Sequence, residues 1–79
     1  MRLDKFLKVS RIIKRRTVAN EACDAGRVLV NEKPAKASLN IKEGDVIEIH
    51  FGTSCVKVEV LDVVETVKKD EAKELYRYL

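Results

Sequence analysis

Residues 25–31 read Ala-Gly-Arg-Val-Leu-Val-Asn, and the spacing of apolar side chains changes within this stretch. Before Gly26 the apolar residues recur every three or four positions, which is typical of amphipathic helices. After Arg27 they alternate with period two, which predicts a half-buried strand. Gly26 suits the boundary because a residue just past a helix end often needs positive φ. The stretch therefore predicts helices followed by a sheet, an α+β order.

Two short helices are expected before that boundary. Leu3, Phe6 and Leu7 fall at i, i+3 and i+4, so they share one helix face that must pack on a core. Thr17 is a candidate N-cap for a second helix that extends to about Ala25. The inner surface of this second helix carries small side chains, which would let another backbone approach closely.

Short antiparallel strands are expected after the boundary. Residues 28–30 form the first strand, residues 31–34 resemble a turn, and residues 35–38 could form a short return strand. Residues 46–51 and 56–60 alternate apolar with polar side chains and are close in sequence, so an antiparallel hairpin is their simplest pairing. The alternation predicts a sheet with one buried face.

The last stretch, residues 66–79, returns to helical spacing. Ala72, Leu75 and Leu79 recur at i, i+3 and i+7, with acidic residues near the start, so a C-terminal helix is predicted. This helix would either dock on the sheet or remain a partly frayed extension.

Length and composition favour a single small domain. A chain of 79 residues buries only a small core, so residues 1–51 are expected to form the main unit and residues 52–79 to complete it with a strand and a helix. No apolar run resembles a signal peptide or a bilayer span, and a cytoplasmic protein is expected. Cys23 and Cys55 lack a CxxC spacing or a neighbouring His, so we expect reduced, half-buried thiols and neither a metal nor a cofactor.

The charge of the chain is strongly polarised. Ten of the sixteen Lys and Arg residues lie in the first 36 positions against four acidic residues, whereas the remainder carries six basic and nine acidic residues. The N-terminal segment therefore has a net charge of +6 and the rest −3. A concentration of Lys and Arg on a small domain is typical of proteins that bind the phosphates of RNA or DNA.

Ordered sequence blocks carry a family resemblance. The blocks are Arg2-Leu3-Asp4-Lys5-Phe6-Leu7, Ser10-Arg11, Lys14-Arg15-Arg16-Thr17, Ala25 to Asn31, and Lys42 to Ile47. In this order and spacing they resemble the RNA-binding domain named after ribosomal protein S-four, over residues 2–51. The resemblance implies a small α+β S-four-like (alpha-L) fold, with two N-terminal helices packed on a short antiparallel sheet.

The predicted RNA-binding residues form one cationic ridge around the two helices. Basic residues of the first helix and of the entry to the second would lie beside backbone N–H groups at a helix start, and the resemblance adds Lys36 at the end of the ridge. The full set is Arg2, Lys5, Lys8, Arg11, Lys14, Arg15, Arg16 and Lys36. Asp4 would repel phosphate, so we expect it to pair with an Arg such as Arg16 and to orient that guanidinium.

The opening Arg-Leu-Asp-Lys and the later Lys-Arg-Arg-Thr are more specifically similar to the RqcP (YabO) family of bacterial ribosome quality control. That family is related to the ribosome-associated fifteen-kilodalton heat-shock protein. The resemblance implies a protein that binds a split large ribosomal subunit still holding peptidyl-tRNA. It would contact 23S rRNA and the tRNA, and would help a partner tailing factor extend the nascent chain. We expect a monomer.

Two alternatives remain open at the level of sequence. One is a general RNA-binding chaperone with no ribosomal address. The other is a protein-interaction module in which Leu75, Tyr76 and Leu79 dock on a partner. The chain has no glycine-rich phosphate loop and no recognisable pairing of a nucleophile with a base, so a non-enzymatic protein is expected.

Overall fold

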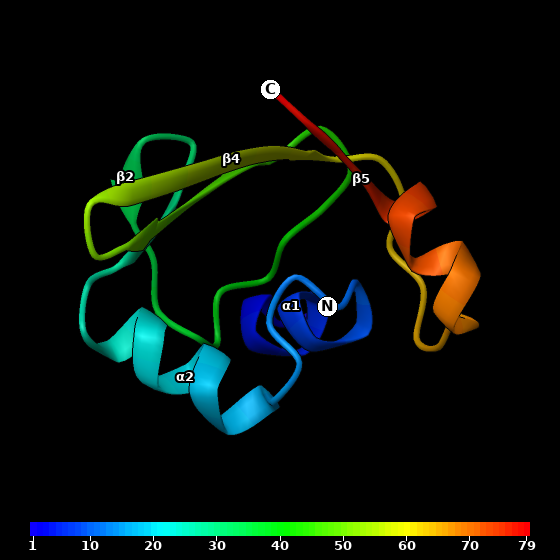
Figure 1. The fold of residues 1–79 in the computed structure, drawn as a ribbon, viewed down its shortest axis with the longest axis horizontal. Helices are drawn as coiled ribbons and strands as arrows, with labels where there is room; N and C mark the ends of the chain where they lie inside the picture. The colour runs from blue at the N-terminus through cyan, green and yellow to red at the C-terminus, as the bar shows by residue number, and fades with distance from the viewer.

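The protein folds as a five-stranded sheet with two α-helices packed on one of its faces (Figure 1). The computed structural model describes residues 1–79. The elements, in chain order, are α1 (Leu3–Val9), α2 (Arg16–Asp24), β1 (Val28–Val30), β2 (Lys33–Pro34), β3 (Val46–Phe51), β4 (Ser54–Val60), the 3₁₀ helix η1 (Lys69–Leu75) and β5 (Tyr76–Tyr78). The strand order is β2-β1-β3-β4-β5, and every neighbouring pair is antiparallel. The expected α+β fold is confirmed. No helix has both the length and the apolar character that crossing a bilayer would require.

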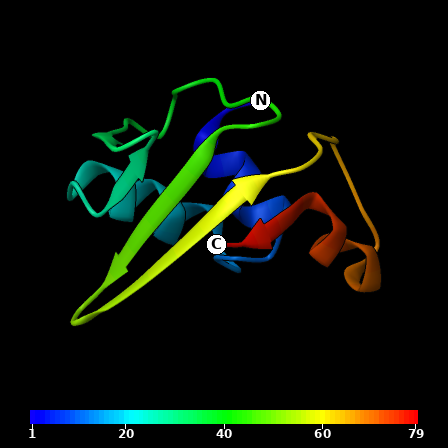
Figure 2. The same ribbon diagram turned by 90° about the horizontal axis from the view of Figure 1, so that it is seen from above.

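The core lies between the helices and the face of the sheet turned toward them. Figure 2 looks down on the sheet and shows α1 and α2 behind it. Leu3, Phe6 and Leu7 of α1 are fully buried, as their spacing predicts. From the sheet, the alternating residues of β1, β3 and β4 complete the core: Val28, Val30, Ile47, Ile49, Val58 and Val60. The expectation of two half-buried thiols was wrong, because Cys23 is buried in this core and Cys55 is exposed on β4.

The first hairpin is tighter than the sequence suggested. Strand β2 is Lys33–Pro34, and Val30 pairs with Lys33, so the predicted return strand at residues 35–38 is not formed. The turn consists of Asn31 and Glu32 alone, with φ values of 52° and 71°. Two left-handed residues in a two-residue loop match the right-handed twist of a hairpin. The early turn leaves residues 35–40 free to run back along the start of α1.

Helix α2 begins one residue before the predicted N-cap. Arg15 is the N-cap residue, and Thr17 lies inside the first turn, so the predicted capping role of Thr17 was wrong. The helix ends at Asp24, and Gly26 follows with φ 75°, as expected for a left-handed residue after a helix. This placement sets Arg16 and Asn20 one helical turn apart on the same side of α2.

The C-terminal stretch is partly helix and partly strand. Residues Lys69–Leu75 form a 3₁₀ helix, but Tyr76–Tyr78 pair with β4, so the prediction of helix to residue 79 was wrong. Without this pairing, β4 would be an edge strand with unpaired backbone groups. The alternating aromatic residues Tyr76 and Tyr78 also favour extended structure. Arg77 Nε also donates to Glu59 Oε1 at 2.6 Å across this strand pair.

Candidate nucleic-acid interface

A buried carboxylate organises the basic residues at the start of both helices. Asp4, in the first turn of α1, is 2% exposed. Its Oδ1 accepts hydrogen bonds from the Lys5 backbone N–H at 2.8 Å and from Arg2 Nε at 3.2 Å. Its Oδ2 accepts from Arg2 Nη2 at 3.3 Å, Arg16 Nε at 3.4 Å and Asn20 Nδ2 at 3.3 Å. Asp4 therefore joins the residue before α1 to the first two turns of α2.

The pKa of Asp4 reflects two opposing effects. Burial raises the pKa, because desolvation disfavours the charged carboxylate. The hydrogen bonds from Asn20, Arg2, Arg16 and the Lys5 N–H lower it, and together they outweigh the burial. The pKa therefore lies below its ordinary value of 3.8, and Asp4 is ionised at neutral pH. A charged Asp4 can hold two guanidinium groups by charge-assisted bonds.

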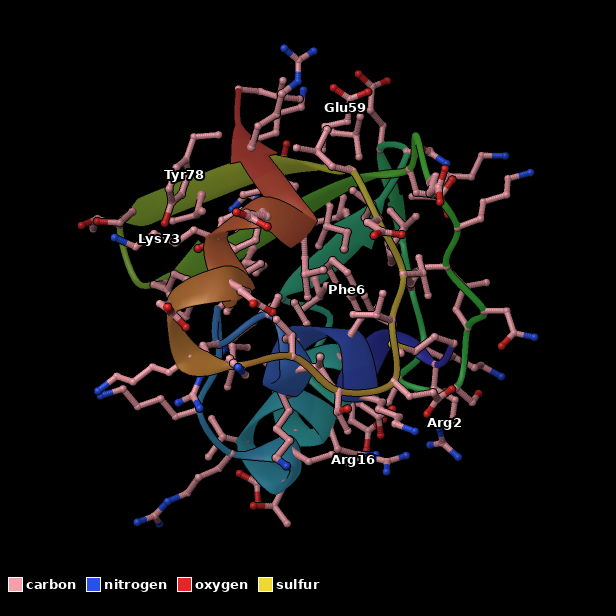
Figure 3. The ribbon with its side chains drawn as sticks, turned by 90° about the vertical axis from the view of Figure 1, so that its right-hand side faces the viewer. Arg2, Phe6, Arg16, Glu59, Lys73 and Tyr78 are labelled. Atoms are coloured by element: carbon pink, nitrogen blue, oxygen red, sulfur yellow. The ribbon has the colours of Figure 1, made fainter.

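The guanidinium groups of Arg2 and Arg16 are hydrogen-bonded to the buried Asp4 carboxylate and are also exposed to solvent. Their side chains are 47% and 46% exposed, and the two lie close together in Figure 3. Arg16 contacts Asp4 through Nε alone, so both of its Nη groups remain available as donors. A planar guanidinium with a fixed inner edge and a free outer edge is suited to binding phosphate oxygens.

Lys36 lies close to Arg2, although it is distant in sequence. The segment after β2 runs along α1, where Asp4 N donates to Ala37 O at 3.2 Å and Leu3 N donates to Leu39 O at 2.8 Å. As a result, Arg2, Asn20 and Lys36 line one shallow hollow. Lys36 also lines the adjoining hollow beside Lys33 and Lys42, so positive charge continues along the loops beyond the helices.

A second group of basic residues lies around the end of α1. Lys8, Arg11 and Lys14 line a hollow that also contains Glu65. Arg11 is in the tight turn after α1 and has a left-handed φ of 63°. Glu65 is an exposed side chain of the segment between β4 and η1, and it forms an ion pair with Lys5. Lys5 contributes to the lowered pKa of Glu65, first by this hydrogen bond and then by charge.

The predicted residues thus fall into two groups on the helical side of the protein. Arg2 and Arg16 line one hollow with Asp4, and Arg2 also lines the neighbouring hollow with Lys36, whereas Lys8, Arg11 and Lys14 line a hollow at the end of α1. Lys5, on α1, forms an ion pair with Glu65, which lines the hollow of the second group. Arg15 is exposed at the N-cap of α2 and lines none of these hollows.

Sequence reasoning missed Asn20 and Glu65. Asn20 could have been found, because it lies four residues after Arg16 and therefore on the same helix face. Glu65 carries no such signal, since it reaches Lys5 from sixty positions away.

The chain matches a known domain family and named relatives. Residues 1–47 match the S4 domain, which is the S-four domain that the sequence resembles. The chain is 59% identical over 76 residues to the RQC P-site tRNA stabilizing factor of Halalkalibacterium halodurans, covering 96% of this chain and 86% of the relative. It is 52% identical over 79 residues to the Bacillus subtilis protein of the same name, covering 100% of this chain and 92% of the relative.

Two solved structures share the fold over the whole chain. A trimeric structure of Vibrio cholerae Heat Shock Protein 15 superposes with a TM-score of 0.92 at 29% identity, covering 100% of this chain and 81% of that one. The solution structure of the hypothetical protein HP1423 gives a TM-score of 0.85 at 31% identity, covering 100% of this chain and 96% of that one.

Proposed function

Because the chain belongs to the S4-domain family of RQC P-site tRNA stabilizing factors, we propose that it is a non-catalytic RNA-binding protein that stabilises tRNA during ribosome quality control. In this proposal the protein acts in the cytoplasm as a monomer. It binds 23S rRNA and peptidyl-tRNA on split large (50S) subunits and holds the tRNA while a partner factor extends the C-terminal tail of the nascent chain. The RNA-binding residues are the eight basic side chains predicted above, with Arg2 and Arg16 central.

The observation that carries the proposal is the Asp4-anchored pair of guanidiniums. Arg2 and Arg16 are fixed by one buried carboxylate and are each about half exposed. Fixing a guanidinium before binding reduces the side-chain entropy that is lost when it contacts phosphate. A mobile surface arginine would bind less tightly for the same number of contacts.

Two groups of cations on one side of a small domain suit an RNA bridge. The Arg2, Arg16 and Lys36 group, which lines two neighbouring hollows, and the Lys8, Arg11 and Lys14 group could each contact a different RNA backbone. Such bridging needs charge and shape but no bond-making chemistry. The partner RNAs are therefore held by many weak phosphate contacts, and their release depends on salt.

The alternative of a protein-interaction module is less well supported. Leu75 is 3% exposed and belongs to the protein's own core, so it is not available to a partner. Tyr76 packs against the same core from β5. Leu79 is exposed, but one terminal residue does not form a docking surface.

Co-sedimentation with purified large subunits, in the presence of excess free tRNA, tests the proposal. Wild-type protein should sediment with the subunits, and Arg2→Ala or Arg16→Ala should weaken association while circular dichroism stays unchanged. The slope of log affinity against log salt should fall by about 0.7–0.9 for each phosphate contact removed. If the protein bound free tRNA as well as it binds the subunits, excess tRNA would abolish co-sedimentation. That result would favour a general RNA chaperone.

Lys73→Ala is the matched control. Lys73 is an exposed cation of η1 and lies away from Arg2 and Arg16 in Figure 3. Lys73→Ala lowers the net charge by one, as Arg2→Ala and Arg16→Ala do, so it controls for the loss of non-specific attraction to RNA. If Lys73→Ala weakened association as much as Arg16→Ala, the binding would depend on total charge and the proposed site would be rejected.

A further inference from the structure

Three side chains with metal-binding atoms meet on the outer face of the sheet. Glu48 and His50 belong to β3, and Cys55 belongs to β4. A carboxylate oxygen, an imidazole nitrogen and the sulfur lie within 4.8 Å of one another. His50 Nε2 and Glu48 Oε2 are hydrogen-bonded at 2.6 Å.

The strand register explains why these groups converge. His50 pairs directly with Cys55 across the hairpin. The His50 backbone N–H donates to Arg27 O at 2.9 Å, on the side away from β4. His50 and Cys55 therefore form a pair without mutual backbone hydrogen bonds, which is the arrangement that brings cross-strand side chains closest. Glu48 precedes His50 by two residues and so projects from the same face.

Neither the core nor the basic surface uses these residues. Ile47 and Ile49, which alternate with them, are fully buried on the opposite face of the sheet, toward the helices. The hydrogen bond between Glu48 and His50 gives those two residues a role but leaves Cys55 unexplained. An exposed free cysteine is unusual, because unpaired cysteines are among the most buried residues in proteins.

We propose that Glu48, His50 and Cys55 bind one Zn²⁺ through Oε2, Nε2 and Sγ, with a fourth position open. Carboxylate, imidazole and thiolate are the three ligand types that zinc prefers, and a three-residue set leaves room for water or a donor from a partner. Zinc bonds of 2.0–2.3 Å place tetrahedral ligand atoms about 3.3–3.8 Å apart. The side chains reach that separation by small rotations, which the exposure of His50 and Cys55 permits.

One neighbouring residue affects the affinity of this zinc site. Lys57 pairs with Glu48 across the hairpin and brings a positive charge to the same face. Its ammonium lies on a long flexible stem and can turn toward solvent when the metal binds. The zinc site lies on the opposite face of the sheet from α1 and α2, so metal binding does not depend on the proposed RNA function.

Titration of reduced, tag-free protein with Co²⁺ and then Zn²⁺ tests the proposal. One equivalent of Co²⁺ should give a thiolate-to-cobalt charge-transfer band, and Zn²⁺ should displace it. Cys55→Ala should abolish the band. His50→Ala should weaken Zn²⁺ binding, measured against a chromophoric chelator, by about tenfold or more, since loss of a ligand costs at least as much as loss of its supporting groups. Glu48→Gln should weaken it in the same direction.

Cys23→Ala is the control. Cys23 is buried, and desolvation, followed by the charges of Asp4 and Asp24, raises its pKa to about 11, so it is a poor metal ligand. This variant should keep the charge-transfer band and the stoichiometry. Absence of the band in the wild-type protein, retention of it in Cys55→Ala, or one metal per two chains would each overturn the site. Circular dichroism of each variant separates loss of binding from loss of fold.

Discussion

Asp4 Oδ2 lies 3.4 Å from Arg16 Nε, across twelve positions of sequence, and this contact ties α1 to α2. The same carboxylate binds Arg2, so one buried acid fixes both guanidiniums. An acidic residue within a basic surface weakens phosphate binding by its charge. Here it is buried behind the two arginines, and it keeps their outer edges turned toward solvent.

Asp4→Ala should reduce both stability and RNA affinity. The variant loses an acceptor of several charge-assisted hydrogen bonds, which should lower the free energy of unfolding by about 1.5–3 kcal/mol. Arg2 and Arg16 would become mobile, so binding to large subunits should weaken although the net positive charge rises. Urea denaturation and co-sedimentation measure the two effects. Full affinity and full stability together would show that Asp4 has no orienting role.

The stability supplied by Asp4 should depend on pH in a defined direction. Its folded-state pKa lies below the ordinary value of 3.8, so the folded protein favours the ionised form. The contribution is complete above the unfolded-state pKa, about 3.9, and is lost as pH falls through the folded-state pKa. The difference in unfolding free energy between wild-type protein and Asp4→Asn should therefore shrink on acidification below about pH 4. A constant difference would contradict this assignment.

Glu65→Gln should strengthen RNA binding. Glu65 pairs with Lys5 and lines the hollow that contains Lys8, Arg11 and Lys14. Removing its charge frees Lys5 and removes a repulsive group, so affinity for large subunits should rise by about two- to fivefold, the range expected of one exposed ion pair. Filter binding at fixed salt measures the change. Glu71→Gln, at an exposed position on η1, has the same charge change and should have little effect.

Glu32→Gly should stabilise the protein. Glu32 has φ 71° in the two-residue turn between β1 and β2, a conformation that costs a side-chain-bearing residue about 1–2 kcal/mol. Glycine would relieve this strain and create Asn-Gly, the preferred sequence of such turns, although its greater freedom in the unfolded chain offsets part of the gain. We expect an increase in unfolding free energy of about 0.5–1 kcal/mol. A decrease would show that the Glu32 side chain makes a stabilising contribution.

Local patterns predicted most of the fold. The spacing of Leu3, Phe6 and Leu7 identified a buried helix face, and alternation identified β3 and β4, because burial on one face leaves a period in the sequence. The C-terminal strand was not predictable in this way. Ala72 and Leu75 fit helical spacing, but Tyr76–Tyr78 became a strand because the edge of β4 was open, which is a property of the assembled sheet.

The candidate RNA site was likewise predictable only where local sequence determines it, and not where it depends on tertiary contacts. Asp4 was recognisable as an arginine partner because an unpaired carboxylate in an RNA-binding segment would repel phosphate. The grouping of Arg2 with Lys36 depends on backbone hydrogen bonds between α1 and residues 37–39, and no local pattern encodes those bonds. The ion pair of Lys5 with Glu65 has the same origin in tertiary structure.

A cryo-EM reconstruction of tRNA-bearing large subunits, isolated with the tagged protein, tests the central claim most directly. The account predicts that the helical side contacts RNA, with the guanidiniums of Arg2 and Arg16 within hydrogen-bonding distance of phosphate oxygens and Asp4 still behind them. The outer face of the sheet should point away from both RNAs. A reconstruction in which the sheet face binds RNA, while Arg2 and Arg16 face solvent, would contradict the account.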